Sequence, residues 1–181
     1  TGAWYMTDEY VKARQADCKA DKLTGVAPTP TECTYRLDVP LVRALAKLFI
    51  AHLGNASVTE LGAGIGHYRR ALLGLGVRQY TAFDGMPDVD VKSHGAVGYA
   101  DLSQPCEHIV RSDYGMSLEV AEHIPPQFEA TFLDNLDRAN ERGVIVSWSA
   151  FKDTAHGHVN AKSASAAQRT IEARGYVLDR N

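Results

Sequence analysis

Residues 60–66 read Glu-Leu-Gly-Ala-Gly-Ile-Gly, and these three alternating glycines constrain the fold more than any other feature of the chain. A β-prone run, residues 57–61, leads into them, and a helical run, residues 67–75, follows directly. Glycine tolerates the left-handed backbone of a sharp turn, and it lets a ligand approach the free N–H groups at a helix start. The segment therefore predicts a strand, a ligand-binding turn and a helix.

The rest of the sequence alternates between short β-prone runs and helical runs. The predicted strands are residues 57–61, 79–84, 97–100, 114–120, 143–149 and 176–178. The predicted helices are residues 39–53, 67–75, 87–92, 105–111, 126–140 and 163–174. This alternation is typical of an α/β fold with a doubly wound, mostly parallel sheet and helices on both faces. We assign residues 37–181 to this domain and residues 1–36 to an N-terminal cap segment with a helix at residues 8–22.

The glycine spacing separates two classes of nucleotide-binding turn. A dinucleotide-binding dehydrogenase would carry G-x-G-x-x-G, and with Gly62 and Gly64 as its first two glycines the third would fall at His67. The observed pattern is E-x-G-x-G-x-G, which disfavours a nicotinamide-dependent oxidoreductase.

The pattern instead resembles the first motif of class I S-adenosylmethionine-dependent methyltransferases, and the resemblance covers residues 38–178. It implies S-adenosylmethionine as cofactor, with Glu60 holding the amino acid end of that molecule. It also implies that Asp84, at the end of the second strand, contacts the ribose hydroxyls. The residues that the resemblance places at the cofactor are Glu60, Gly62, Gly64, Gly66, Asp84, Asp101 and Leu102, the last two at the adenine.

The end of the chain departs from this family pattern. Family members usually finish with a sixth and an antiparallel seventh strand, whereas this sequence stops at Asn181, just past the predicted sixth strand. Either a C-terminal segment lies beyond the given sequence or the sheet has one strand fewer.

Candidate catalytic residues follow the fourth and fifth strands, because ligands of open α/β sheets bind beyond the carboxyl ends of the strands. Methyl transfer is an in-line displacement, so the protein aligns the nucleophile and, where needed, removes its proton. Imidazoles suit that task near neutral pH. The candidates are Glu119, Glu122, His123, His156 and His158.

The E-x-x-E-H spacing of Glu119, Glu122 and His123 supports two interpretations. It resembles clusters of ubiquinone-pathway O-methyltransferases and small-RNA 3'-end methyltransferases, where such residues hold a divalent metal that positions a hydroxyl. A Glu-His pair after the fourth strand is also widespread in class I methyltransferases without a metal, where it shapes the cofactor pocket. We therefore assign no metal from the sequence.

Composition narrows the expected partners. The 181 residues carry a net charge of −3 without a basic run, so we expect no nucleic-acid partner. No apolar stretch approaches the roughly 20 residues of a membrane span, so we expect a soluble protein. Three cysteines without a C-x-x-C pair favour reduced thiols and a cytoplasmic location, with a disulfide between Cys18 and Cys33 as the alternative.

The predicted function is methyl transfer to a hydroxyl or amine of a small molecule. No Asn-Pro-Pro-Tyr or Asp-Pro-Pro-Tyr tetrapeptide follows the fourth strand, which argues against methylation of nucleobase amino groups. A catalytically silent module that binds the cofactor or a protein partner is the alternative.

Overall fold

The computed structural model describes residues 37–152 and 157–179, and its centre is a five-stranded parallel sheet. The strand order is β3-β2-β1-β4-β5, and all four pairings are parallel. The strands are β1 (Val58–Leu61), β2 (Tyr80–Asp84), β3 (Gly98–Tyr99), β4 (Ser112–Ser117) and β5 (Asn140–Val146). The predicted doubly wound sheet is confirmed, and β1, the strand before the glycine turn, lies at its centre.

Helices lie between β1 and β2, between β2 and β3, and between β4 and β5, as the alternation predicts, but none lies between β3 and β4. The helices are α2 (Val39–Lys47), which continues into the π-helical turn η2 (Leu48–His52), α3 (His67–Gly74), α4 (Val89–Lys92), α5 (Glu129–Arg138) and α6 (Ala164–Glu172). Two short 3-10 turns, η3 (Ala121–His123) and η4 (Pro126–Phe128), lie between β4 and α5. The start of α2 has a local cause, since the Asp38 carboxylate accepts a hydrogen bond of 2.9 Å from the Leu41 N–H and Pro40 occupies the first turn.

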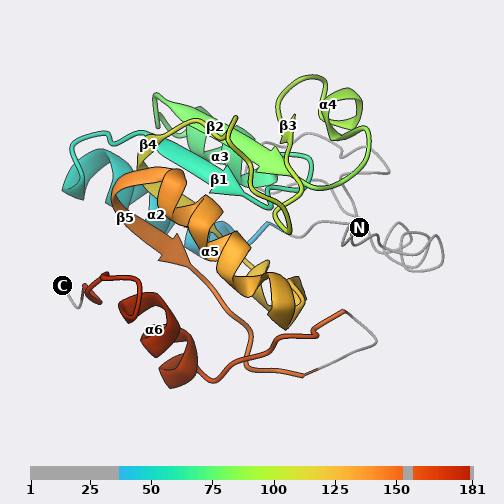
Figure 1. Cartoon of the computed structure of the whole chain (residues 1–181). Helices are drawn as coiled ribbons and strands as arrows, with labels where there is room; N and C mark the ends of the chain where they lie inside the picture. The colour runs from blue at the N-terminus through green and yellow to red at the C-terminus, as the bar shows by residue number, and fades with distance from the viewer. Residues whose placement is uncertain (1–36, 153–156, 180–181) are drawn as a thin grey trace.

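The sheet is covered on both faces, and each face has its own apolar cluster (Figure 1). On one face Phe49 and Leu72 pack over Val58 and Met116. On the other face the apolar side of α5, which includes Phe132, covers the ends of β1 and β2. Such double coverage explains why the central strands carry few exposed residues.

The predicted helix at residues 105–111 is wrong. This segment has a turn and irregular backbone, and the buried side chain of Asn135 on α5 bonds backbone groups at its start. Asn135 Oδ1 accepts from the Cys106 N–H at 2.9 Å, and its Nδ2 donates to the Gln104 carbonyl at 2.8 Å. A side chain from another element thus pairs backbone groups at the start of this segment.

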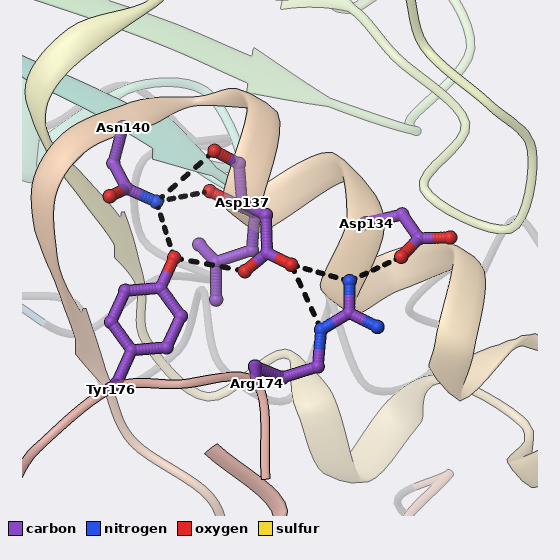
Figure 2. A network of polar contacts seen from close by, with 6 residues as sticks. Asp134, Asp137, Asn140, Arg174 and Tyr176 are labelled. Atoms are coloured by element: carbon purple, nitrogen blue, oxygen red, sulfur yellow. Dashed lines mark hydrogen bonds and ion pairs between the residues drawn. The ribbon is translucent and has the colours of Figure 1, made fainter. Parts of the chain in front are cut away.

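The predicted sixth strand at residues 176–178 is also absent from the described structure, and β5 is the edge of the five-stranded sheet. Figure 2 shows what holds this segment: Arg174 and Tyr176 bond to α5, and Tyr176 also bonds to the side chain of Asn140 at the start of β5. Arg174 pairs with Asp134 and Asp137, and the Tyr176 hydroxyl donates to Asp137 Oδ1 at 2.9 Å. Asn140 Nδ2 in turn donates to the Tyr176 hydroxyl at 2.8 Å. Within the described residues the sheet therefore has five strands, fewer than the usual class I pattern.

Strand limits differ from the prediction at β4 and β5, which both begin earlier than expected.

The predicted N-terminal cap and its helix at residues 8–22 lie outside the described residues. None of the helices in residues 37–152 and 157–179 combines the length and apolar character that a bilayer crossing requires.

The contacts of Asp137 predict a difference between two neighbouring aspartates. Asp137→Ala removes the acceptor shared by Arg174 and Tyr176, and we expect it to lower the free energy of unfolding by about 1–2 kcal/mol. Asp134→Ala is the matched control, because Asp134 is more exposed and its carboxylate bonds Arg174 alone among the residues that the structure describes, so about 0.5 kcal/mol or less is expected. Urea denaturation of both variants measures the difference, and equal losses would contradict this account of the C-terminal segment.

Candidate functional site

The glycine turn joins β1 to α3, and all three of its glycines have left-handed backbones. The φ angles are +82° at Gly62, +55° at Gly64 and +85° at Gly66, the residue that precedes α3. Gly62 has a second constraint, since a Cβ there would lie 2.3 Å from Cγ2 of Val120. The loop after β4 therefore packs directly on the turn, and no side chain fits between them.

Asp84 ends β2 and is fixed by backbone groups. Its Oδ2 accepts from the Gly64 N–H at 2.6 Å, and its Oδ1 accepts from the Met86 N–H at 2.8 Å. Burial raises the pKa of the Asp84 carboxyl, and the two N–H donors oppose that shift. The predicted ribose-binding carboxylate thus lies against the predicted glycine turn, which the sequence spacing alone did not establish.

Glu60 is buried, with 2% of its surface exposed. The Tyr80 hydroxyl on β2 donates to its Oε2 at 2.9 Å. Among the described residues no ion pair involves Glu60, and burial raises its pKa from 4.5 to about 7. A buried carboxylate with one neutral partner is suited to a cationic group brought by a ligand.

Asp101 and Leu102 follow β3, but their side chains have local roles. Asp101 Oδ1 accepts from both the N–H and the hydroxyl of Ser103, at 3.0 and 2.7 Å. The Leu102 side chain is buried in the cluster beneath α5. Their contact with an adenine ring stays a prediction.

The structure brings three of the five predicted catalytic residues together. Each of Glu122, His123 and His158 has one atom that can ligate a metal, and these three atoms lie within 4.8 Å of one another. The two imidazoles meet edge to face, with ring centroids 4.7 Å apart. Glu119 is held apart, since its Oε1 and its N–H both bond the Ser147 hydroxyl on the segment after β5. His156 lies outside the described residues.

Backbone carbonyls set the orientation of both imidazoles. Nδ1 of His123 lies 3.2 Å from the Gly157 carbonyl, and Nδ1 of His158 lies 2.7 Å from the Phe151 carbonyl. Because a carbonyl only accepts, these contacts assign the proton to Nδ1 and leave Nε2 with a free lone pair. Burial, and then the neighbouring His158, lower the pKa of His123, which favours its neutral form.

Glu122 completes a donor set that fits a divalent cation. It is fully buried, and neither carboxylate oxygen makes a hydrogen bond of standard geometry within the described part of the chain. Burial raises its pKa. Two imidazoles oriented through their Nδ1 atoms and one unsatisfied carboxylate form the arrangement that transition metals favour.

Sequence reasoning missed the residues that support the site. These residues contact site residues that lie 20 to 58 positions away in the sequence or across a loop, so no spacing rule predicts them. They are Tyr80, Val120, Ser147 and the carbonyls of Phe151 and Gly157. Of these residues, Tyr80 alone could have been found, from the pairing of neighbouring strands in the sheet. Tyr80 pairs in register with Val58, two residues before Glu60, which places both side chains on one face.

Comparison with known proteins rests on structure alone, because no family model and no curated protein matches the sequence. The methyltransferase domain of bacterial CtHen1 is 18% identical, with 77% of this chain and 88% of that chain covered and a TM-score of 0.58. A putative methyltransferase from Bacillus halodurans is 22% identical, with 79% of this chain and 70% of that chain covered and a TM-score of 0.59. The 1,6-didemethyltoxoflavin-N1-methyltransferase from Burkholderia thailandensis, solved with S-adenosylhomocysteine, is 20% identical. Of this chain 78% and of that chain 70% is covered, with a TM-score of 0.56. The chain has the class I methyltransferase fold.

The burial of Glu60 predicts a pH-dependent cost in stability. Its pKa is about 7 in the folded chain against 4.5 ordinarily, so the folded state binds more protons between these values and stability falls as the pH rises through that window. Glu60→Gln lacks this loss. We expect its free energy of unfolding to exceed that of the wild type by about 2–3 kcal/mol at about pH 8, with no difference near pH 4.5.

Urea denaturation across this pH range measures the difference. Glu107→Gln, at an exposed glutamate, is the control and should follow the wild type. A constant offset of Glu60→Gln at all pH values would show that the glutamate is not the titrating group.

Proposed function

We propose that this chain binds S-adenosylmethionine at the glycine turn and transfers its methyl group to a hydroxyl or amine of an acceptor. The observation that carries the proposal is the pair of carboxylates at the turn beyond the central strands, the buried Glu60 and the half-buried Asp84. Glu60 has no cation of its own among the described residues, and Asp84 is held by two N–H donors. A ligand with an ammonium group and a diol supplies the complements of both.

Each end of the cofactor has a counterpart in the site. Glu60 pairs with the ammonium of the amino acid end, where burial strengthens the attraction. Asp84 accepts from the ribose hydroxyls with the lone pairs that Gly64 and Met86 leave free. In this proposal Asp101 and the backbone of Leu102 contact the adenine.

The cluster beyond β4 supplies the chemistry at the methyl acceptor. Transfer requires the nucleophile in line with the sulfur–methyl bond, and a hydroxyl must also lose its proton. The Nε2 lone pairs of His123 and His158 can accept that proton or orient the acceptor. Glu119 lies at the exposed rim and is available to a bound acceptor.

Glu122, His123 and His158 are also the residues that would hold a divalent metal. Such an ion, when bound, fixes a hydroxyl near the methyl group and makes its proton more acidic. The protein's own part is to hold both imidazoles beside the Glu122 carboxylate, with the rings oriented by the Gly157 and Phe151 carbonyls.

A small molecule is the first candidate acceptor. The low net charge without a basic run supports it, and so does the similarity to a methyltransferase named for 1,6-didemethyltoxoflavin. The second candidate is the hydroxyl at the end of a small RNA. The triad of Glu122, His123 and His158 favours it, together with the similarity to bacterial CtHen1 and to the small RNA methyltransferase HEN1.

Cofactor binding is the first prediction of this proposal. Calorimetric titration with S-adenosylhomocysteine should give micromolar affinity, and Asp84→Asn should weaken it by about 10- to 100-fold through the loss of charged hydrogen bonds. Asp90→Asn, on the exposed side of α4, is the matched control and should bind as the wild type does. A well-folded wild type without measurable binding would refute the proposal.

Metal dependence and acceptor class are tested in one transfer assay. Labelled methyl groups from S-adenosylmethionine are followed onto a panel of small phenols, diols and amines and onto short RNAs with free or 3'-deoxy ends. We expect transfer to a hydroxyl that requires Mn²⁺ or Co²⁺, is lost in His158→Ala and persists in His52→Ala, at an exposed histidine of η2.

The outcomes separate the candidates. Labelling of free-ended RNA but not 3'-deoxy RNA selects the second acceptor class, whereas labelling of the panel alone selects the first. Full activity after chelation would refute the metal. Cofactor binding without transfer to any acceptor would support the alternative, a catalytically silent module that binds the cofactor or a protein partner.

A further inference from the structure

Glu60 and Tyr80 form a polar pair inside an otherwise apolar layer. Both side chains point to the sheet face that α2 and α3 cover, where Val58, Ala82 and Met116 surround them. Tyr80 is 7% exposed, and its hydroxyl meets Oε2 of Glu60 at 2.9 Å. Within the described residues this hydroxyl is the one hydrogen-bond donor to the Glu60 side chain.

The charged and titratable groups around this pair come from two elements. From β2, Asp84 lies near Glu60 and its negative charge opposes ionisation of that carboxyl. From α3, Tyr68 lies close enough to Glu60 to interact with it, and Arg69 acts on Tyr80. These neighbours provide no ion pair, so the Tyr80 hydroxyl is the group that favours the carboxylate of Glu60 directly.

We infer that Tyr80 is a positioning residue for the cofactor, whose hydroxyl holds the Glu60 carboxylate in the place and form that receive the ligand's ammonium. This inference rests on the proposed function, because it gives Glu60 the ammonium as its partner. Tyr80 itself touches no substrate. It acts through Glu60 from the neighbouring strand.

The inference makes cofactor binding depend on pH in a stated direction. Burial raises the pKa of Glu60 to about 7, and the Tyr80 hydrogen bond is the contribution that lowers it. Since only the carboxylate attracts the ammonium, affinity should rise with pH and fall by about ten-fold from pH 8 to pH 6. Removing the hydroxyl raises the pKa of Glu60 further, so the rise in affinity moves to higher pH.

The test is the affinity for S-adenosylhomocysteine between about pH 6 and pH 8.5, measured by calorimetry. Tyr80→Phe keeps the ring and removes the hydroxyl. We expect it to bind several-fold more weakly at pH 7 and to approach the wild type at pH 8.5. Tyr114→Phe is the matched control: Tyr114 pairs with Val58 from the other side of β1, as Tyr80 does, but no hydrogen bond joins it to Glu60 among the described residues, so the profile should not change.

A double variant separates positioning from general structural damage. Glu60→Gln should bind weakly with a flat pH profile, and adding Tyr80→Phe to it should cause no further loss. An equal loss from Tyr80→Phe with and without the glutamate would overturn the inference, as would a loss that is the same at every pH.

A measurement without ligand keeps this test separate from the proposed function. Carbon-13 NMR titration of the Glu60 carboxyl, assigned by its disappearance in Glu60→Gln, should show a higher pKa in Tyr80→Phe than in the wild type. An unchanged pKa overturns the role of Tyr80 whatever the protein binds. A raised pKa with no S-adenosylhomocysteine binding by the wild type would instead contradict the proposed function.

Discussion

The contact between the end of β2 and the glycine turn is the constraint on which the site depends. Asp84 Oδ2 takes the Gly64 N–H at 2.6 Å, so the turn after β1 is tied to the neighbouring strand. Gly62 must lack a side chain, because Val120 from the loop after β4 fills that space. Three loops therefore meet at one point, beyond the carboxyl ends of adjacent parallel strands, which is where open α/β sheets bind ligands.

Local patterns were sufficient to predict the sheet and the turn. The Gly62, Gly64 and Gly66 spacing and the strand–helix alternation identified the fold class, because both depend on backbone conformation and on hydrophobic period. The helix at residues 105–111 failed for the opposite reason. Asn135, some 30 positions away, bonds backbone groups at the start of that segment, and no local pattern contains such information. The prediction of the sixth strand failed similarly, since Arg174 and Tyr176 bond the side chains of Asp137 and Asn140, which are distant in the sequence.

The site shows the same division between local and distant information. The residue types at Glu60, Asp84 and the E-x-x-E-H segment were readable, but their environments were not. Burial of Glu60 and Glu122 comes from packing of whole elements, and it changes what these carboxylates do. Each of these two buried carboxylates lowers stability in the ligand-free protein. In the proposed function each pairs with a cation, an ammonium at Glu60 and a divalent metal at Glu122. Such destabilised groups are typical of functional sites.

The central claim is that the glycine turn is the cofactor site, and the amide NMR spectrum with and without S-adenosylhomocysteine tests it most directly. The account predicts that the largest shifts occur at Gly62, Gly64 and Met86, whose N–H groups line the turn or hold Asp84, with little change along α6. Shifts confined to other regions, or no shifts at saturating ligand, would contradict it.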